Sequence, residues 1–90
     1  MAPSRYMPTT DGKVAYIGQS SVSVLTIEEA MAQAGFLAEW AEKAQAQPDM
    51  VTLGWDRSYA LSAKACVEAA KEAAQIRRSR EAQVALAVAA

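Results

Sequence analysis

The sequence contains no histidine and a single cysteine, Cys66, among its 90 residues. Without histidine, the chain lacks the commonest general base and the commonest metal ligand of proteins. One cysteine excludes an intrachain disulfide, and with it a small secreted disulfide scaffold. We therefore expect a cytoplasmic protein that is not an enzyme, with no catalytic residue, no cofactor and no metal site.

Large aliphatic side chains are also scarce. Leu, Ile, Val and Phe together supply 16 residues, whereas alanine alone supplies 21. No apolar run approaches the roughly 18 residues of a membrane-spanning helix, so we expect a soluble chain with no membrane partner. A domain of 90 residues with so thin a core is expected to gain stability from a protein partner or from a second copy of itself.

The N-terminal part of the chain carries turn and strand signals. Residues 1–12 contain two prolines and the turn signal Asp11-Gly12, which predict an irregular arm. Residues 13–26 contain two β-branched segments, KVAYIG and SVSVLT, and these predict a short β-hairpin. An isolated hairpin is marginally stable in water, so it either packs on a helix or adds to the sheet of another chain.

A first helix is predicted over residues 27–47. It begins with the spacing of a capping box, in which Thr26 and Glu29 each satisfy a backbone N–H that would otherwise lack a partner. It ends before Pro48, which cannot continue a helix. Its apolar face consists mainly of alanine.

A second helix is predicted over residues 57–76, after a connector at 48–56. Its core face is also rich in alanine, so no long side chains hold the two helix axes apart. The charges of the two helices are opposite in sign, which favours their lying side by side. We therefore expect residues 13–90 to form one mainly α domain, built on an antiparallel two-helix hairpin.

The chain after this second helix is expected to overhang the hairpin. The apolar stripe ends at Ile76, because Arg77 and Arg80 occupy the next positions on the core face. The two helices already match in length, at about 30 Å each. Residues 77–90 are therefore predicted to be a helical extension that docks elsewhere. The alternative is a degradation signal, because the small apolar end resembles the tails that bacterial unfoldases capture.

Two aromatic residues depart from the amphipathic pattern of the first helix. Phe36 falls on the charged side of the first helix, with Trp40 near the boundary. Either the β-hairpin covers Phe36, or Phe36 is an anchor for a partner. The predicted partner-binding residues are the aromatic anchors and the side chains of the extension, namely Phe36, Trp40, Trp55, Arg77, Arg78, Arg80, Val84, Leu86 and Val88.

A basic residue recurs at every seventh position of the second helix. The stripe consists of Arg57, Lys64, Lys71 and Arg78. It suggests a homodimer that binds nucleic acid, as an alternative to a protein-binding function. Glu68 and Glu72 interrupt it, and the net charge of −1 opposes association with phosphates.

These observations predict a small non-enzymatic protein-binding module. The expected role is that of a bacterial or phage accessory protein, which docks on a larger protein complex as an inhibitor, an adaptor or an assembly component. Formation of a homo-oligomer is expected as well. Two alternatives remain open, the homodimer that binds nucleic acid and a self-assembling structural or virion subunit.

Overall fold

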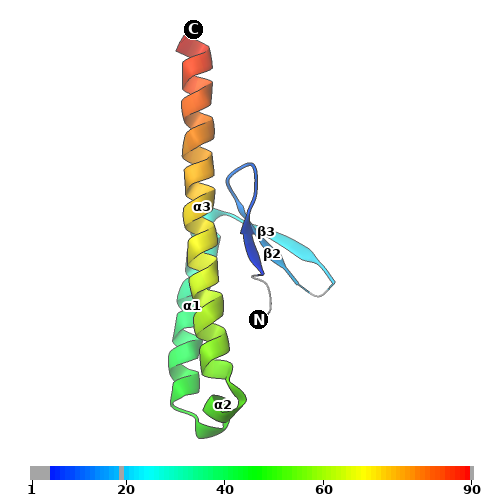
Figure 1. The fold of residues 1–90 in the computed structure, drawn as a ribbon, viewed down its shortest axis with the longest axis vertical. Coiled ribbons are helices and arrows are strands. Elements are labelled where there is room, and N and C mark those ends of the chain that lie inside the picture. Colours follow the sequence, from blue (N-terminus) through cyan, green and yellow to red (C-terminus); the bar gives the residue numbers. More distant parts are fainter. Residues whose placement is uncertain (1–4, 19, 90) are drawn as a thin grey trace.

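The computed structural model describes residues 5–18 and 20–89. In this part of the chain a small antiparallel sheet is followed by three helices (Figure 1). The strands are β1 (Tyr6–Pro8), β2 (Val14–Ile17) and β3 (Val22–Leu25), and the helices are α1 (Ile27–Gln45), α2 (Pro48–Leu53) and α3 (Trp55–Ala89). The fold is mainly α with a short N-terminal β element, as the sequence predicts.

Strand β1 lies within the segment that was expected to be irregular, residues 1–12. It pairs antiparallel with β2, so that the order in the sheet is β1-β2-β3. Proline is tolerated at Pro8 because β1 is an edge strand, where a missing N–H need not break the ladder. The turn signal Asp11-Gly12 thus joins two strands, and the predicted hairpin is part of a three-stranded sheet.

Helix α1 begins as the capping box predicts. The Thr26 hydroxyl accepts a hydrogen bond from the Glu29 N–H at 3.1 Å, and the Glu29 carboxylate accepts one from the Thr26 N–H at 3.0 Å. The bond from the Thr26 backbone is the main reason why the pKa of Glu29 lies below its usual value. The helix ends at Gln45, two residues before the predicted end at residue 47.

Two helices replace the predicted connector, second helix and extension. The connector contains α2, which Gly54 ends in the left-handed conformation at φ +79°. Helix α3 then runs without interruption for 35 residues, through the boundary expected at Ile76. The charged residues after Ile76 end the packing of this helix against α1 but not the helix itself, because this part of α3 extends past α1 and its charged side chains stay exposed (Figure 1).

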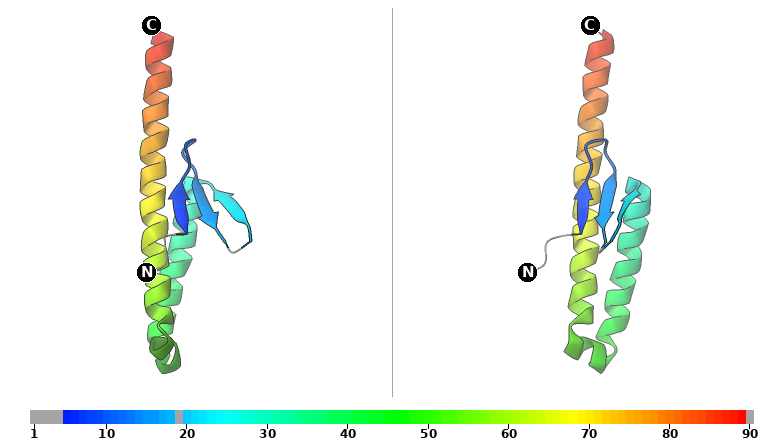
Figure 2. Two further views of the ribbon diagram at one scale, coloured as in Figure 1. Left: turned by 45° about the vertical axis from the view of Figure 1, so that its right-hand side comes forward. Right: turned by 90° about the vertical axis from the view of Figure 1, so that its right-hand side faces the viewer.

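The core lies where α1 packs along the first half of α3, under one face of the sheet (Figure 2). Its buried members are Ala30, Ala34 and Leu37 of α1, Ala63, Cys66, Ala69, Ala70 and Ala73 of α3, and Tyr6 and Val14 of the sheet. The Cys66 thiol donates a hydrogen bond to the carbonyl oxygen of Ala30 at 3.0 Å. A side-chain contact with the backbone of the facing helix requires a close approach, which the small residues allow. We call the packed interface between α1 and α3, formed by these buried alanines with Leu37 and Cys66, the alanine seam.

The close packing of the alanine seam predicts that one larger side chain will push α1 and α3 apart. Ala70→Leu should lower the free energy of unfolding by about 1–3 kcal/mol, because the buried site has no room for three more carbons. Ala82→Leu is the matched control, since Ala82 is exposed on the same helix. Urea unfolding of both variants measures the difference, and equal stabilities would contradict a close-packed seam.

Candidate protein-binding surfaces

The turn between β1 and β2, residues 9–13, is internally ordered. The Thr9 N–H donates to the Lys13 carbonyl at 2.8 Å, and the Gly12 N–H donates to the Thr9 carbonyl at 3.1 Å. The Thr9 hydroxyl donates to the Asp11 carboxylate, and this bond is the largest cause of the lowered pKa of Asp11. The turn therefore presents a fixed shape to α3.

Two of the predicted partner-binding arginines contact this turn. Arg80 Nη1 donates to the carbonyl oxygen of Thr10 at 2.8 Å. Gly12, at φ +81°, lies so close to Arg77 that an added Cβ would stand 2.9 Å from the Arg77 Cβ. Arg77 Nε also lies 3.6 Å from a carboxylate oxygen of Glu81. Both arginines thus hold the sheet against α3, and binding of a partner by them stays a prediction.

The part of α3 that extends beyond α1, residues 77–89, is here called the overhang (Figure 1). Its large apolar side chains Val84, Leu86 and Val88 are 62%, 72% and 81% exposed. Val84 and Val88 lie four residues apart and line one shallow hollow with Arg80 and Asp11. Leu86 points about 160° away from Val84 around the helix. The three predicted residues therefore belong to two different faces.

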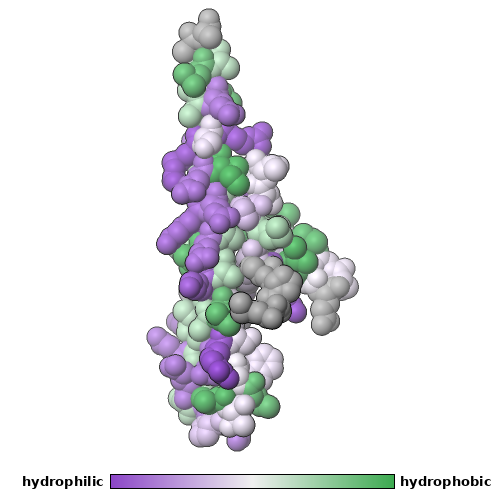
Figure 3. All heavy atoms as spheres, in the orientation of Figure 1, coloured by the Kyte–Doolittle hydropathy of each residue, from purple (hydrophilic) through white to green (hydrophobic). Residues whose placement is uncertain are grey.

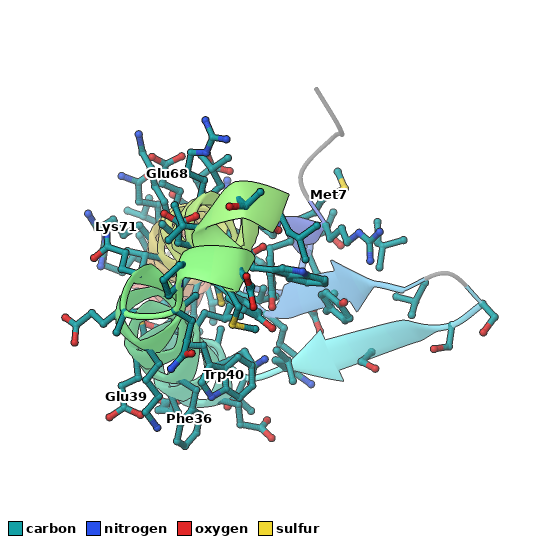
Figure 4. All side chains as sticks on the ribbon, turned by 90° about the horizontal axis from the view of Figure 1, so that it is seen from below. Met7, Phe36, Glu39, Trp40, Glu68 and Lys71 are labelled. Atoms are coloured by element: carbon teal, nitrogen blue, oxygen red, sulfur yellow. The ribbon has the colours of Figure 1, made fainter. Side chains whose placement is uncertain are left out.

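The predicted aromatic anchors meet at the other end of the molecule. Trp40 and Trp55 both contact Tyr59, with ring centroids 5.8 and 5.7 Å apart. Phe36 stays 53% exposed beside Trp40, so the sheet does not cover it as one interpretation required (Figure 4). The predicted anchors do not include Tyr59, although it packs against the edge of the core and its spacing of four residues from Trp55 is typical of side chains that meet on one face of a helix.

The basic stripe does not form a continuous positive surface. Lys64 and Lys71 lie at the groove between α1 and α3, and Glu68 lines the same groove between them. Figure 4 places Glu68 and Lys71 on the side of the helices away from the sheet. A carboxylate one helical turn from each lysine lowers the attraction for phosphates. The remaining members of the stripe, Arg57 and Arg78, are exposed on the same helix.

Apolar side chains are unevenly distributed over the surface. In Figure 3 hydrophilic residues run along one side of α3, while apolar residues gather on the sheet and near both ends of the molecule.

Within the described residues, no three His, Cys, Asp or Glu side chains are grouped as metal ligands would be. Burial raises the pKa of the Cys66 thiol, which disfavours the reactive thiolate. No helix of the described chain combines the length and apolar character needed to span a membrane.

Comparison with protein-family models, with curated proteins and with solved structures found no match. The functional interpretation therefore depends on the surfaces of this chain. Two features stand out in the geometry described above. The overhang carries apolar side chains beyond the end of α1, and the sheet carries others away from the helices.

The packing of Gly12 against Arg77 gives opposite predictions for two glycines. Gly12→Ala should destabilise the protein by more than about 1 kcal/mol, because its positive φ and the nearby Arg77 Cβ both oppose a side chain. Gly35→Ala should instead stabilise it by about 0.5–1 kcal/mol, because this position inside α1 has open space around it. Thermal and urea unfolding measure both changes, and a harmless Gly12→Ala would contradict the docking of the turn on α3.

Proposed function

We propose that this chain is a small non-enzymatic protein-binding module, which docks on a larger protein through the overhang. The single observation that carries the proposal is that the face of α3 that packs on α1 continues beyond the end of α1 with exposed apolar side chains. The buried positions Cys66, Ala70 and Ala73 are followed on the same face by Arg77, and then by Val84 and Val88. The scaffold of this surface is an antiparallel hairpin of α1 and the first half of α3.

The exposed area supports a partner. The chain exposes 6611 Å², whereas a compact monomer of this mass exposes about 5,100 Å². Its radius of gyration is 16.3 Å, against about 12 Å for a compact domain of this length. The excess area is larger than the roughly 800 Å² that one partner covers in a standard interface. A bound protein would therefore bury surface that this chain leaves exposed.

The chemistry of the overhang indicates the kind of partner. Val84 and Val88 are spaced as anchors for an apolar groove, the mode by which amphipathic helices bind. Arg77, Arg78 and Arg80 lie at the base of the same segment, and only Arg78 has no described contact with the turn. The complementary surface is an apolar groove with acidic side chains at one end. The protein that carries this groove belongs to a larger complex. The present chain docks on it as a bacterial or phage accessory protein and acts as an inhibitor, an adaptor or an assembly component.

Affinity purification with three versions of the chain tests this function. The baits are the unchanged chain, the double variant Val84→Ser/Val88→Ser, and the matched control Leu86→Ser, which alters the opposite face of the same segment. We expect one protein from the source cell to bind the unchanged chain and the control, and to bind the double variant at least tenfold more weakly.

Circular dichroism of the three baits separates a lost contact from a lost fold. All three should keep the same helical signal, because the substituted side chains are exposed. Equal recovery of every bound protein by the double variant, or loss of binding by Leu86→Ser alone, would contradict docking through Val84 and Val88.

A further inference from the structure

The sheet has an open edge at β3. Its order is β1-β2-β3, so among the described residues no strand lies beyond β3. The Gly18 N–H donates to the Ser21 carbonyl at 2.8 Å, which makes these two residues a hydrogen-bonded pair. Such pairs alternate along an antiparallel ladder. Ser21, Ser23 and Leu25 therefore direct their backbone groups to β2, whereas Val22 and Val24 direct theirs to the open edge.

The residues of this edge, although few, lack the charges and prolines that often prevent pairing with another strand. Edge strands of natural proteins are commonly protected by charges, prolines or bulges. Residues 20–26, SSVSVLT, contain no charged residue and no proline. Val22 and Val24 are 63% and 57% exposed although both are apolar. The backbone groups at the edge are thus flanked by side chains that favour burial.

The outer face of the sheet is apolar as well. The register pairs Met7 with Ala15 and Ala15 with Val24, and it pairs Ile17 with Val22. Directly paired residues share a face, so these five side chains lie together on the face away from the core. Figure 4 shows Met7 pointing away from the helices. Apolar side chains therefore cover both faces of the sheet, and the helices bury only the inner one.

We propose that β3 binds β3 of a second copy of this chain, in antiparallel register about a two-fold axis at Ser23. In this register Val22 lies opposite Val24 of the second copy, and each of the two Val–Val pairs exchanges two backbone hydrogen bonds. The two three-stranded sheets become one sheet of six strands. The interface is isologous, as in most soluble homodimers.

The sequence of β3 favours a second copy of this chain as the partner that pairs with the open edge. Rotation about Ser23 places valine against valine on the outer face and serine against serine on the inner face, with no like charges opposed. The apolar outer faces of the two sheets then become continuous.

The outward direction of the Val24 N–H provides a selective variant. Val24→Pro removes this N–H but none of the hydrogen bonds between β2 and β3, so the variant should lose dimerisation while keeping its own sheet. Val24→Thr is the matched control, because threonine is β-branched and retains the N–H. Sedimentation equilibrium across a dilution series should give twice 9.6 kDa for the unchanged chain and the control. Val24→Pro should dimerise at least tenfold more weakly.

A cysteine pair tests the register independently of any change in folding. Ser23 faces itself across the two-fold axis in a non-hydrogen-bonded pair, where Cα atoms lie about 4.5 Å apart, within reach of a disulfide. Ser23→Cys should therefore give a covalent dimer on mild oxidation. Ser21→Cys should not, because residue 21 lies opposite Leu25 of the second copy.

Each outcome bears on the proposal separately from the function of the overhang. The variant Val84→Ser/Val88→Ser should remain dimeric, since it leaves β3 unchanged. A monomeric unchanged chain at all concentrations would overturn self-pairing. A dimer that withstands Val24→Pro, or that cross-links through residue 21 rather than 23, would overturn pairing through β3.

Discussion

The close contact of α1 with α3 along the alanine seam is the constraint on which the rest of the structure depends. The Cys66 thiol reaches the Ala30 carbonyl because the buried positions around it are mostly alanine. Small side chains allow this approach, but each buries little apolar area and contributes correspondingly little to stability. The core is therefore completed from outside the helices, by Tyr6 and Val14 of the sheet.

Because the core is built mostly of alanine, many of the larger apolar side chains lie at the surface. Val84 and Val88 continue the seam beyond α1, and Val22 and Val24 flank an open strand edge. The two surfaces differ in geometry, since one is a helix face and the other a sheet edge. We propose different occupants for them, a groove on a larger protein for the overhang and a second copy for β3. A dimer through β3 would carry two overhangs, and such an arrangement raises the apparent affinity for a target with two sites.

Local signals in the sequence predicted local structure well. The Thr26 and Glu29 spacing located the start of α1, and β-branched residues located β2 and β3. Strand β1 was missed because it has three residues, includes Pro8 and is fixed by pairing with β2. The end of the apolar stripe at Ile76 predicted a boundary between a second helix and a helical extension. The extension is helical, but α3 is continuous through Ile76, and only its packing against α1 ends there. The contact of Arg80 with Thr10 spans 70 positions, and no sequence pattern predicts it.

Hydrogen exchange along α3 tests the central claim that packing ends where the seam loses its partner. Amides of residues 66–73 lie in the packed part of the helix, and amides of residues 82–88 lie in the overhang. We predict that the second group exchanges at least about a hundredfold faster in the isolated chain, because local opening is cheap where few apolar contacts are broken. Equal protection along the whole of α3 would contradict the account, since it would require the overhang to be packed as firmly as the seam.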